Sequence, residues 1–353
     1  MAIKILGDIV SVVSEHISNP NKSGYQIFVG LEHYDSGEPV ITRHGSTEQL
    51  ESSVKHFIEG DILVARRNVY LKRAGVVNFE GVTSGDSIVL RVKEEKYKDI
   101  IPFILNTDDF WDYAEQNSDG TMSKRLAPDV LLEYECNIPE NHQSIADKLW
   151  AAYKLKVSYR QMITATDEMV KSQFIEMFGS ESNKVLLEDV VFVKDDYRKP
   201  INEGVRSEMK EGELYPYYGA TGVVDYINDY ITDEELLCVA EDCGNYNAGE
   251  ESAYIIRGKA WVNNHAHLVK MKDSCDIKYL YYYLKIANLM PYVSGTTRLK
   301  LTQKKLREIP VVLPTKDKQT TFVAIAEQAD KSKFELRKSI EAIDAVIKSL
   351  ING

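Results

Sequence analysis

The sequence predicts an α+β protein in which a mixed α/β unit followed by a long helix occurs twice, in a pseudo-two-fold repeat. Two segments, near residues 138–178 and 313–350, carry the apolar spacing of a helix and lack an interior Gly or Pro. They open on Pro139 and Pro314. Short strand-like stretches and Gly-rich turns precede both segments, so each long helix is expected to follow a globular unit.

The sequence offset between the two prolines recurs upstream of them, which indicates an internal repeat. Residues 120–126 (Gly-Thr-Met-Ser-Lys-Arg-Leu) and 295–301 (Gly-Thr-Thr-Arg-Leu-Lys-Leu) are separated by the same offset. Further upstream, residues 60–65 resemble residues 234–240. A protein made of two similar halves suits a target that is itself nearly two-fold, such as a DNA duplex.

Both long segments carry a heptad pattern, which predicts an apolar seam for helix pairing. In the second segment the seam residues are Phe322, Ala326, Ala329, Lys333, Leu336, Ile340, Ile343, Ile347 and Leu350. In the first they are Ile145, Leu149, Ala152, Lys156, Tyr159, Ile163, Thr166, Val170 and Met177. Lys156 and Lys333 occupy matching seam positions. A lysine in a seam is either a device that fixes the register of the pair or a chance occurrence.

The composition is that of an ordinary globular protein. Among 353 residues, 44% are hydrophobic and 27% are charged, and no apolar run is long enough to span a bilayer. The four cysteines do not make a disulfide framework and the N-terminus has no signal-peptide pattern, so we expect a cytoplasmic protein with reduced thiols and no membrane partner. The net charge of −11 argues against a surface that is basic throughout, but it is compatible with local basic strips and with faces that bind partner proteins.

The two units are expected to be mixed α and β structures. The first is predicted to have a short helix or strand at 3–14, strands at 25–31, 62–65, 76–79 and 87–92, and a helix at 100–113. The second is predicted to have strands at 187–193, 222–227, 236–240, 253–256 and 267–271, and a helix at 277–289. This order is not a βαβ alternation, so a doubly wound nucleotide-binding sheet is not expected. The predicted domains are residues 1–139, a helix at 140–179, residues 180–313, and a helix at 314–353.

The strongest basic cluster of the first unit lies in residues 66–73, which hold four cations. Arg and Asn side chains read guanine and adenine edges, and Lys and Arg hold phosphates. The candidate DNA-contacting residues here are Arg66, Arg67, Asn68, Tyr70 and Lys72. The alternative interpretation is a solvated hairpin or loop.

Further cations stand at matched places just before the two long helices. Lys124 and Arg125 precede the first helix, and Arg298 and Lys300 precede the second. A positive loop at the junction of a domain and a helix can hold the DNA backbone. The alternative is the start of a helix with a charged outer face.

Residues 215–222 form an aromatic, Gly-punctuated stretch that is predicted to be a loop. Its glycines allow close approach of the backbone, and Tyr218 and Thr221 are candidates for contact with DNA. The tyrosines can equally pack in the core.

Several kinds of catalytic or metal site are not supported. Residues 263–267 hold two histidines, but their spacing with Cys238 and Cys243 fits no zinc pattern, and a turn capped by Asn side chains is the favoured interpretation. There is no Gly-x-Gly-x-x-Gly, no phosphate-binding loop and no Asn-Pro-Pro-Tyr motif for base methylation. The acidic pairs Asp108–Asp109 and Glu241–Asp242 are interpreted as solvated faces rather than nuclease ligands. Neither a cofactor nor a metal is predicted.

A run of motifs resembles a known family. Residues 216–222 (Pro-Tyr-Tyr-Gly-Ala-Thr-Gly), 239–244 (Val-Ala-Glu-Asp-Cys-Gly) and 261–267 (Trp-Val-Asn-Asn-His-Ala-His) are similar to the target recognition domain of type I restriction-modification specificity subunits. Residues 295–301, 309–314 and the helix after them look like the end of that domain and its spacer helix. The resemblance covers residues 185–353 strongly and residues 1–180 more weakly.

The resemblance implies a subunit without catalytic activity. Each of its two target recognition domains would read one half of a split DNA site, and its two helices would pair as an antiparallel coiled coil that acts as a ruler. A helix of about 36 residues is about 54 Å long, enough to hold two readers roughly 35 Å apart. The implied partners are double-stranded DNA, two methyltransferase (modification) subunits and restriction–translocation subunits. Asn245 and Tyr246 would join Tyr218 and Thr221 on the second half-site.

Three alternatives remain open at this stage. One is a specificity subunit whose single partner chain fuses modification and cleavage. Another is a stand-alone DNA endonuclease with a helical dimerisation arm. The third is a coiled-coil scaffold without a role on DNA, whose binding would lack the salt dependence of phosphate contacts.

Overall fold

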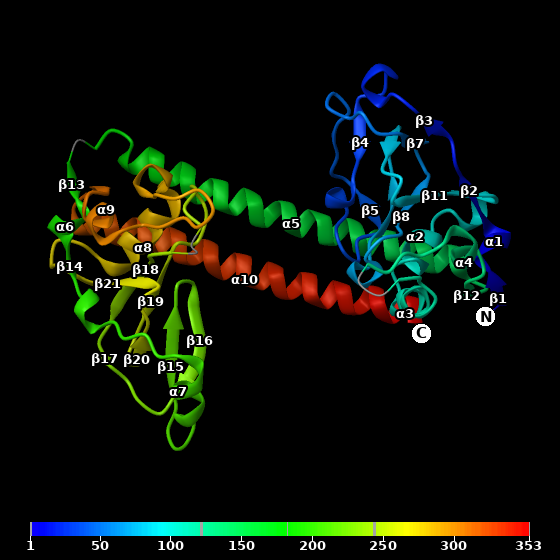
Figure 1. The fold of residues 1–353 in the computed structure, drawn as a ribbon. Helices are drawn as coiled ribbons and strands as arrows, with labels where there is room; N and C mark the ends of the chain where they lie inside the picture. Colours follow the sequence, from blue (N-terminus) through cyan, green and yellow to red (C-terminus); the bar gives the residue numbers. More distant parts are fainter. Residues whose placement is uncertain (1, 121–122, 182, 243–244, 353) are drawn as a thin grey trace. The chain divides into compact units, whose positions relative to one another are not determined.

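The computed structural model describes residues 2–120, 123–181, 183–242 and 245–352, which form two compact units. The first unit comprises Met1–Tyr159 together with Lys338–Gly353, and the second comprises Arg160–Arg337 (Figure 1). Two long helices, α5 (His142–Phe178) and α10 (Lys316–Asn352), have 37 residues each, and each contributes one part to either unit. The units therefore divide each helix, whereas the sequence pattern treats the helices as separate segments.

The first unit contains two five-stranded sheets and a two-stranded ladder. The first sheet has the order β2 (Val10–Val13), β11 (Ser87–Val92), β8 (Ile62–Ala65), β9 (Ala74–Val77) and β5 (Val40–Ile41). The second has the order β3 (His16–Ile17), β7 (Val54–Phe57), β10 (Gly81–Thr83), β4 (Ile27–Val29) and β6 (Gly45–Ser46). The ladder joins β1 (Ala2–Ile5) to β12 (Glu135–Ile138).

The central strand β8 explains the arrangement of this unit. Ile62 and Val64 face one hydrophobic cluster, whereas Leu63 and Ala65 face a second one. Because successive side chains of a strand point to opposite faces, an uninterrupted apolar run is stable only where both faces are covered. Strands β8 and β11 were predicted with the bounds that the structure has.

The helix predicted at residues 100–113 is interrupted. The structure has α2 (Ile101–Ile104) and then α3 (Asp108–Gln116). The Thr107 hydroxyl accepts a hydrogen bond from the Phe110 amide and caps α3, and Asn106 donates to the Ala74 and Pro102 carbonyls. Thr followed by two Asp residues is an N-cap signal, so the chain starts a new helix there. A short helix, α4 (Pro128–Leu132), completes the unit beside α1 (Leu6–Ile9).

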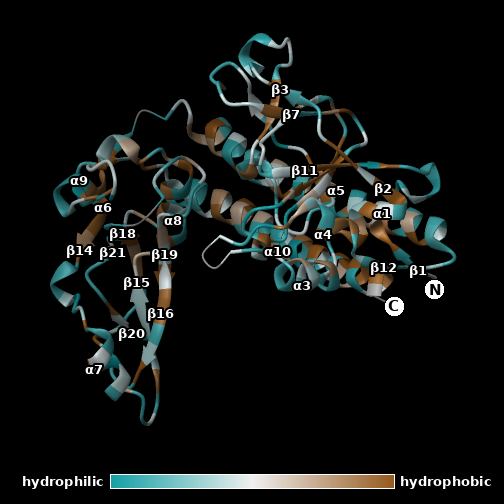
Figure 2. Ribbon diagram, turned by 45° about the vertical axis from the view of Figure 1, so that its right-hand side comes forward, coloured by the Kyte–Doolittle hydropathy of each residue, from teal (hydrophilic) through white to brown (hydrophobic). Residues whose placement is uncertain are grey.

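The second unit repeats this plan. One sheet has the order β14 (Val191–Val193), β21 (Ala266–Met271), β18 (Leu236–Ala240) and β19 (Ala253–Ile256). The other has the order β16 (Gly222–Ile227), β15 (Tyr215–Gly219), β20 (Lys259–Val262) and β17 (Thr232–Asp233). The ladder joins β13 (Lys184–Leu186) to β22 (Pro310–Val312), and the shorter helices are α6 (Leu187–Val190), α7 (Glu203–Glu208), α8 (Ile277–Ile286) and α9 (Gln303–Arg307). In Figure 2, hydrophobic (brown) stretches recur along the strands of both units.

Equivalent strands occupy equivalent places in the two units. The order β2-β11-β8-β9 corresponds to β14-β21-β18-β19, and in both second sheets one strand pair is parallel, β4 with β10 and β15 with β20. The central strand β18 again divides its side chains between two clusters, with Leu237 and Val239 on one side and Leu236 and Cys238 on the other. The internal repeat expected from the sequence is therefore present in the fold.

Two sequence predictions in the second unit were wrong. Residues 215–222 are not a loop: they form β15, a two-residue turn and the start of β16, and β15 pairs with β16 and β20. The Gly and Pro residues suggested a loop, but the tyrosines favour a half-buried strand, and packing decides. Residues 187–193 are not one strand, because the Asp189 carboxylate accepts the Leu186 amide and starts the short helix α6 before β14.

The predicted seam of the two long helices faces inward. All of its residues, in both α5 and α10, are buried or half-buried. In the second unit, Phe322 of α10 packs against Phe174 and Phe178 of α5, with ring centroids 5.4 and 5.7 Å apart. In the first unit, Ile347 and Leu350 pack on the cluster that contains Leu149. Low numbers on one helix meet high numbers on the other, so α5 and α10 run antiparallel within each unit. No helix among the described residues has both the length and the apolar character needed to cross a bilayer.

A loop closes on the central sheet at the same place in each unit. Asp119 and Arg125 exchange two backbone hydrogen bonds, and Ser294 and Lys300 do the same. Each loop contains one glycine with a left-handed backbone, Gly120 (φ 99°) and Gly295 (φ 94°), which is the conformation that favours Gly. The next residue, Leu126 or Leu301, is fully buried.

Hydrogen bonds of a buried histidine support the second loop. His267 on β21 lies 2.7 Å through Nδ1 from the Asp195 carboxylate and 2.7 Å through Nε2 from the Leu301 carbonyl oxygen. Both partners are hydrogen-bond acceptors, so both ring nitrogens of His267 are placed to donate. Burial favours the neutral form of Asp195, but hydrogen bonds from His267 and others outweigh it and lower the Asp195 pKa.

Replacing Asp195 with Asn is expected to destabilise the second unit by about 3 kcal/mol at neutral pH, because the buried carboxylate that accepts hydrogen bonds from His267, the Leu268 amide and Gln303 is lost. The folded pKa of Asp195 lies below its ordinary value of 3.8. Its contribution is therefore complete above that pH and is lost as the pH falls through the folded pKa. Urea unfolding should show a difference from wild type that narrows below pH 4. Asp196→Asn, at the exposed neighbouring position, is the control, and an unchanged difference at low pH would contradict the assignment.

Replacing Gly295 with Ala is expected to cost more stability than replacing Gly212 with Ala. Both glycines have left-handed φ angles, 94° and 86°, which cost about 1 kcal/mol or more for alanine. Only at Gly295 would the added Cβ come within 2.3 Å of a backbone atom, the Arg298 carbonyl oxygen, whereas Gly212 faces open space. Thermal unfolding of the two variants measures the difference, and equal losses of Tm would show that the loop tolerates the side chain.

Candidate nucleic-acid interface

The first-unit cluster comprises Arg66, Arg67, Asn68, Ser123, Lys124 and Arg125, and it forms where β8 ends. The Leu126 amide donates to the Arg66 carbonyl (2.8 Å), and the Asn68 amide donates to the Lys124 carbonyl (3.0 Å). Arg67 and Arg125 form an isolated antiparallel bridge. Two segments that lie far apart in the sequence are thus held side by side by their backbones, and the predicted basic groups of the first unit come together.

The side chains of this cluster form a polar network at the surface. The Arg67 Nε donates to the Ser123 hydroxyl (2.9 Å), which donates in turn to Asn68 Oδ1 (3.1 Å). Asn68 itself has a left-handed backbone (φ 55°), which Asn adopts more readily than most residues. Asp86 lies 3.6 Å from Arg67 and 3.1 Å from Arg125 and balances part of their charge. Both guanidinium groups remain about half exposed.

Two further predicted residues differ in exposure. Tyr70 lies on a short 3-10 helix (Val69–Leu71) and is 61% exposed, so its ring is accessible to a base or sugar. Arg66 is half-buried, and its Nε has no hydrogen-bond partner among the described residues. Arg66 therefore belongs to the inner side of the cluster.

Lys72 and Lys124 are bound to the two ends of α3. The Lys72 ammonium lies 2.7 Å from Asp108, which also pairs with Lys348 at 2.7 Å. These two lysines lower the pKa of Asp108 to about 2. The Lys124 ammonium donates to the Glu115 carbonyl (2.9 Å), where a cation stabilises the end of the helix. Both lysines thus have structural partners. Asp108 and Asp109 are exposed, as the interpretation of this pair as a solvated face expects, and Asp108 also forms two ion pairs.

The second-unit cluster occupies the equivalent place and comprises Arg198, Glu241, Asp242, His265, Arg298 and Lys300. The Leu301 amide donates to the Glu241 carbonyl (2.7 Å), and Asp242 forms a bridge with Lys300. Asp242 is related to Arg67, and Lys300 to Arg125, by the same sequence offset that relates Pro314 to Pro139. The bridge of the first unit therefore recurs at the offset of the sequence repeat.

The cations of the second-unit cluster are paired with carboxylates that lie beneath them. Glu241 contacts Arg198 (2.5 Å) and Lys300 (3.0 Å), and Asp242 contacts His265 (2.7 Å) and Arg298 (2.5 Å). Burial favours the neutral form of Glu241, but hydrogen bonds from Arg198 and Lys300 outweigh it and lower its pKa. The carboxylates are largely covered, whereas Arg298 and Lys300 are more than half exposed. The interpretation of Glu241 and Asp242 as a solvated acidic face was therefore wrong.

The β15–β16 hairpin leads to this cluster. The Tyr218 ring stacks on Tyr254 (centroids 5.5 Å apart, 19° between planes) and is half-buried against the second cluster of the core. The Tyr218 carbonyl accepts the Asn263 amide (3.1 Å), and the Asn263 side chain accepts the His265 amide (2.8 Å). Thr221, at the tip of the hairpin, is exposed. The half-buried ring of Tyr218 therefore mainly supports the hairpin and the turn at Asn263.

The two remaining predicted residues have different surroundings. Asn245 is exposed. Tyr246 is 1% exposed, and its hydroxyl donates to the Ala240 carbonyl (3.2 Å) within the main core. The prediction of a DNA contact for Tyr246 was wrong, because its ring has no accessible face.

A metal site is not formed by the residues that invited one. Burial raises the pKa of the Cys238 thiol to about 12, and Cys243 lies outside the described residues. His265 and His267 are hydrogen-bonded to Asp242 and Asp195. Within the described part of the chain, no group of three or more His, Cys, Asp and Glu side chains is placed to hold a metal ion. The expected turn capped by Asn263 is confirmed.

Sequence reasoning missed Arg198 and His265 as members of the second-unit cluster. Arg198 lies in the stretch after β14, between Tyr197 and Lys199, and reaches Glu241 across 43 positions of the chain. No local pattern marks such a residue. His265 stood in a run that was interpreted as a turn, and its partner Asp242 became evident only from the fold.

Comparison with known proteins agrees with this architecture. Residues 180–344 match the family model for the type I restriction modification DNA specificity domain. A type I restriction enzyme specificity subunit of Haemophilus influenzae, S.HindORF215P, is 36% identical over 149 residues, which are 42% of this chain and 37% of that protein. The specificity subunit of the Escherichia coli type I restriction enzyme EcoprrI is 25% identical over 124 residues, or 34% of this chain and 29% of that protein. The chain thus spans about a third of the length of these curated relatives.

Two solved structures share the fold along nearly the whole chain. The S subunit of a type I restriction-modification system from M. genitalium has a TM-score of 0.58 at 14% identity and covers 99% of this chain and 94% of its own. A chain from the structure of an assembled type I R-M system has a TM-score of 0.57 at 16% identity, with coverages of 99% and 96%. Residues 180–344 thus match a type I restriction modification DNA specificity domain, and the chain shares its fold along nearly its whole length with the S subunit of a type I restriction-modification system.

Proposed function

We propose that this chain is the DNA-binding specificity subunit of a type I restriction-modification complex and that it reads a bipartite DNA site. The observation that carries the proposal is that the chain contains two units of the same fold, and that each unit has a polar and charged cluster at the equivalent position. Each unit presents its cluster where the loop before a long helix closes on the central strand. Two similar readers on one chain suit two half-sites on one duplex.

The first unit would contact its half-site through exposed parts of residues 66–72. Tyr70 would stack on or contact a sugar or base, and Arg67 and Arg125 would bind phosphates or base edges. Asn68 would act mainly by fixing the loop, because its side chain already bonds to Ser123. Lys72 and Lys124 would add positive potential near the DNA from their places at the ends of α3.

The second unit would use Arg298, Lys300, Thr221 and Asn245, with Tyr218 supporting the hairpin. The carboxylates beneath Arg298 and Lys300 hold these cations in place without removing them from the surface. A phosphate would then compete with Asp242 and Glu241 for the outer hydrogen bonds of the two cations. Such pre-organised cations lose little conformational entropy on binding.

The chemistry of modification and cleavage would reside on partner chains. We propose that two methyltransferase subunits bind, one to each half of the repeat, and that restriction–translocation subunits join them, with the protein acting in the cytoplasm. The paired helices would fix the spacing between the half-sites. The chain itself would be non-enzymatic and would require no cofactor.

Replacing Arg125 with Ala is expected to weaken DNA binding for all sequences alike and to reduce its salt dependence. Loss of one phosphate contact lowers the slope of log K against log salt by about 1. Fluorescence anisotropy of a labelled duplex at several salt concentrations measures the slope. Arg43→Ala removes an exposed arginine of the same unit outside the cluster and serves as the control. A slope that falls equally in both variants would exclude a specific phosphate contact at Arg125.

Replacing Tyr70 or Thr221 with Ala is expected to relax specificity in one half of the DNA site only. Both side chains are exposed, so neither change should affect folding. Arg298 is less suitable, since its loss would remove a counter-charge from Asp242. Selection from random duplexes by the complex with its methyltransferase subunit should give a degenerate half-site for each variant, a different half in each case. Relaxation of the same half by both substitutions would contradict the assignment of one reader to each unit.

A further inference from the structure

Each unit buries one lysine between the two long helices. In the first unit, Lys156 of α5 is 6% exposed, and its ammonium lies 2.6 Å from Asp344 of α10 and 2.8 Å from Glu38. In the second unit, Lys333 of α10 is 4% exposed and lies 2.6 Å from Asp167 of α5 and 2.8 Å from Asp330. The roles of the helices are exchanged between the units, as a pseudo-two-fold relation requires.

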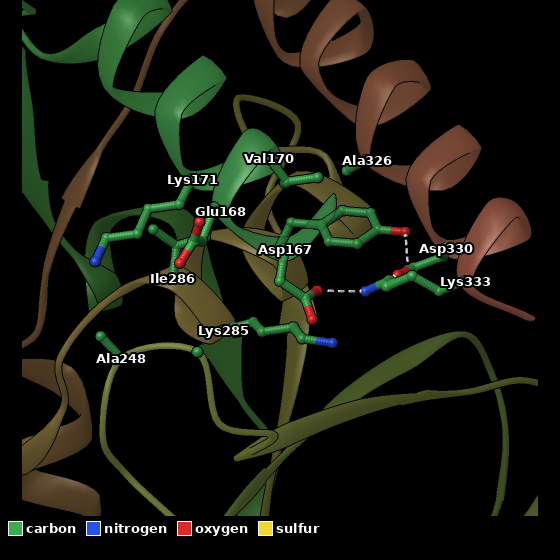
Figure 3. A pocket seen from close by; sticks show the side chains of 12 residues that line it. Asp167, Glu168, Val170, Lys171, Ala248, Lys285, Ile286, Ala326, Asp330 and Lys333 are labelled. Atoms are coloured by element: carbon green, nitrogen blue, oxygen red, sulfur yellow. Dashed lines mark hydrogen bonds and ion pairs between the residues drawn. The ribbon is translucent and has the colours of Figure 1, made fainter. Parts of the chain in front are cut away.

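Each lysine is also connected to the globular part of its own unit. Glu38 belongs to the loop before β5. Asp330 accepts a hydrogen bond from the Tyr282 hydroxyl of α8 (2.7 Å), and Figure 3 shows Asp167, Lys333 and Asp330 gathered in this way. Burial favours the neutral form of Asp330, but its bonds to Lys333 and Tyr282 outweigh it and lower its pKa. The ion pairs therefore fix the helices to each other and to the domain beside them.

Both ion pairs indicate the same alignment of the helices. The residue numbers of Lys156 and Asp344 add up to 500, and so do those of Lys333 and Asp167. In an antiparallel pair this sum is constant for residues at the same level, so one register accounts for both ion pairs. The predicted seam agrees with this register. The numbers of Ile163 and Leu336, and those of Val170 and Ala329, add up to 499, so the register places the members of each pair nearly level with each other.

We propose that Lys156 and Lys333 are register-determining residues that select this alignment of α5 and α10 against slipped ones. A seam of Ile, Leu and Ala is compatible with several heptad registers, since apolar contacts are not directional. A buried lysine is compatible only with a register that offers it a carboxylate. The two Lys–Asp pairs supply that selection, one in each unit.

The sequence opposes the neighbouring registers as well. A slip of one heptad in one direction would bring Lys333 opposite Arg160 and Lys156 opposite Arg337, so both lysines would face a like charge. A slip in the other direction would bring them opposite Phe174 and Ile351, which offer no counter-charge. Of these three registers, only the native one places an aspartate of the facing helix opposite both lysines, which combines attraction with exclusion of the alternatives.

The consequence for DNA rests on the proposed function. A slip of one heptad shifts one helix along the other by about 10.5 Å, at 1.5 Å per residue. This is about three base-pair steps of 3.4 Å. By excluding such slips, the two lysines would restrict the complex to one gap length between its half-sites.

Disulfide cross-linking tests the register without reference to DNA. Cysteines at Ile163 and Leu336 report the native register, and cysteines at Ile163 and Ala329 report the register slipped by one heptad. The chain with its native cysteines alone is the control. The wild-type background should cross-link the first pair, and the double variant Lys156→Asp with Lys333→Asp should lose that cross-link and gain the second, because each aspartate would then face Arg337 or Arg160.

The reciprocal exchange completes the test. Adding Asp167→Lys and Asp344→Lys to the double reversal should restore the native cross-link. A folded double reversal that keeps the native cross-link at wild-type yield would overturn the proposal, as would a failure of the exchange to restore it. If the reversal does not fold, Lys156→Met with Lys333→Met decides, since apolar seams of similar volume usually remain folded. This variant should give both cross-links, and a single native cross-link would refute the proposal.

A methylation map of the Met variant with its methyltransferase subunit tests the consequence for DNA. More than one gap length is expected where wild type has one. Loss of register in the cross-linking assay with no methylation by either protein would leave the register assignment intact and contradict the proposed function. Mixed cross-links with an unchanged single gap length would overturn the role of the lysines in spacing.

Discussion

One backbone contact, made twice, positions the candidate DNA-contacting residues of both units. The residue after the central strand accepts a hydrogen bond from the amide of a fully buried leucine, Leu126 or Leu301. That leucine ends a loop which begins at a left-handed glycine and leads toward a long helix. The contact ties the end of a fully buried strand to the segment that continues, through a short helix and a strand, to the long helix. Side chains on both segments therefore share one surface position in each unit, although they lie far apart in the sequence.

The first-unit cluster and the second-unit cluster balance their basic residues with acidic residues in different ways. In the first unit, one aspartate, Asp86, serves two arginines at the surface. In the second, two covered carboxylates pair with the exposed Arg298 and Lys300 and with the covered Arg198. A chain with a net charge of −11 can thus carry basic positions, because acidic groups orient them locally. At Lys156 and Lys333 carboxylates likewise neutralise buried cations, and we propose above that these ion pairs select one alignment of the two helices.

The periodic features of the sequence predicted much of the fold. Every residue that the heptad pattern assigned to the seam of α5 or α10 is buried or half-buried. The apolar runs at β8, β11, β18 and β19 predicted those strands with the correct bounds. The constant offset between matching motifs identified the repeat because glycine geometry and a buried leucine constrain the loop. These signals are local, so they can be recognised without the fold.

Features that depend on tertiary contacts could not be predicted in this way. The strand β15 was predicted to be a loop because its sequence contains Pro and Gly. Its pairing with β16 and β20 became evident only from the fold. Tyr246 is buried by packing from distant segments, and Arg198 gains its role from a carboxylate 43 positions away. The neighbouring sequence of a tyrosine, an arginine or a pair of acidic residues does not show whether the side chain is exposed to solvent or takes part in a buried hydrogen-bond or ion-pair network. The position of each candidate DNA contact therefore required the fold.

A map of modified bases tests the central claim most directly. The chain would be expressed with the methyltransferase subunit that is proposed as its partner, in a host without other modification systems, and the host DNA would be sequenced by a method that detects methylated bases. The account predicts one motif of two short specific parts separated by a gap of fixed length in which any base is accepted. Methylation at a continuous motif, or none despite a stable complex of the two proteins, would contradict the reading of DNA by two equivalent units.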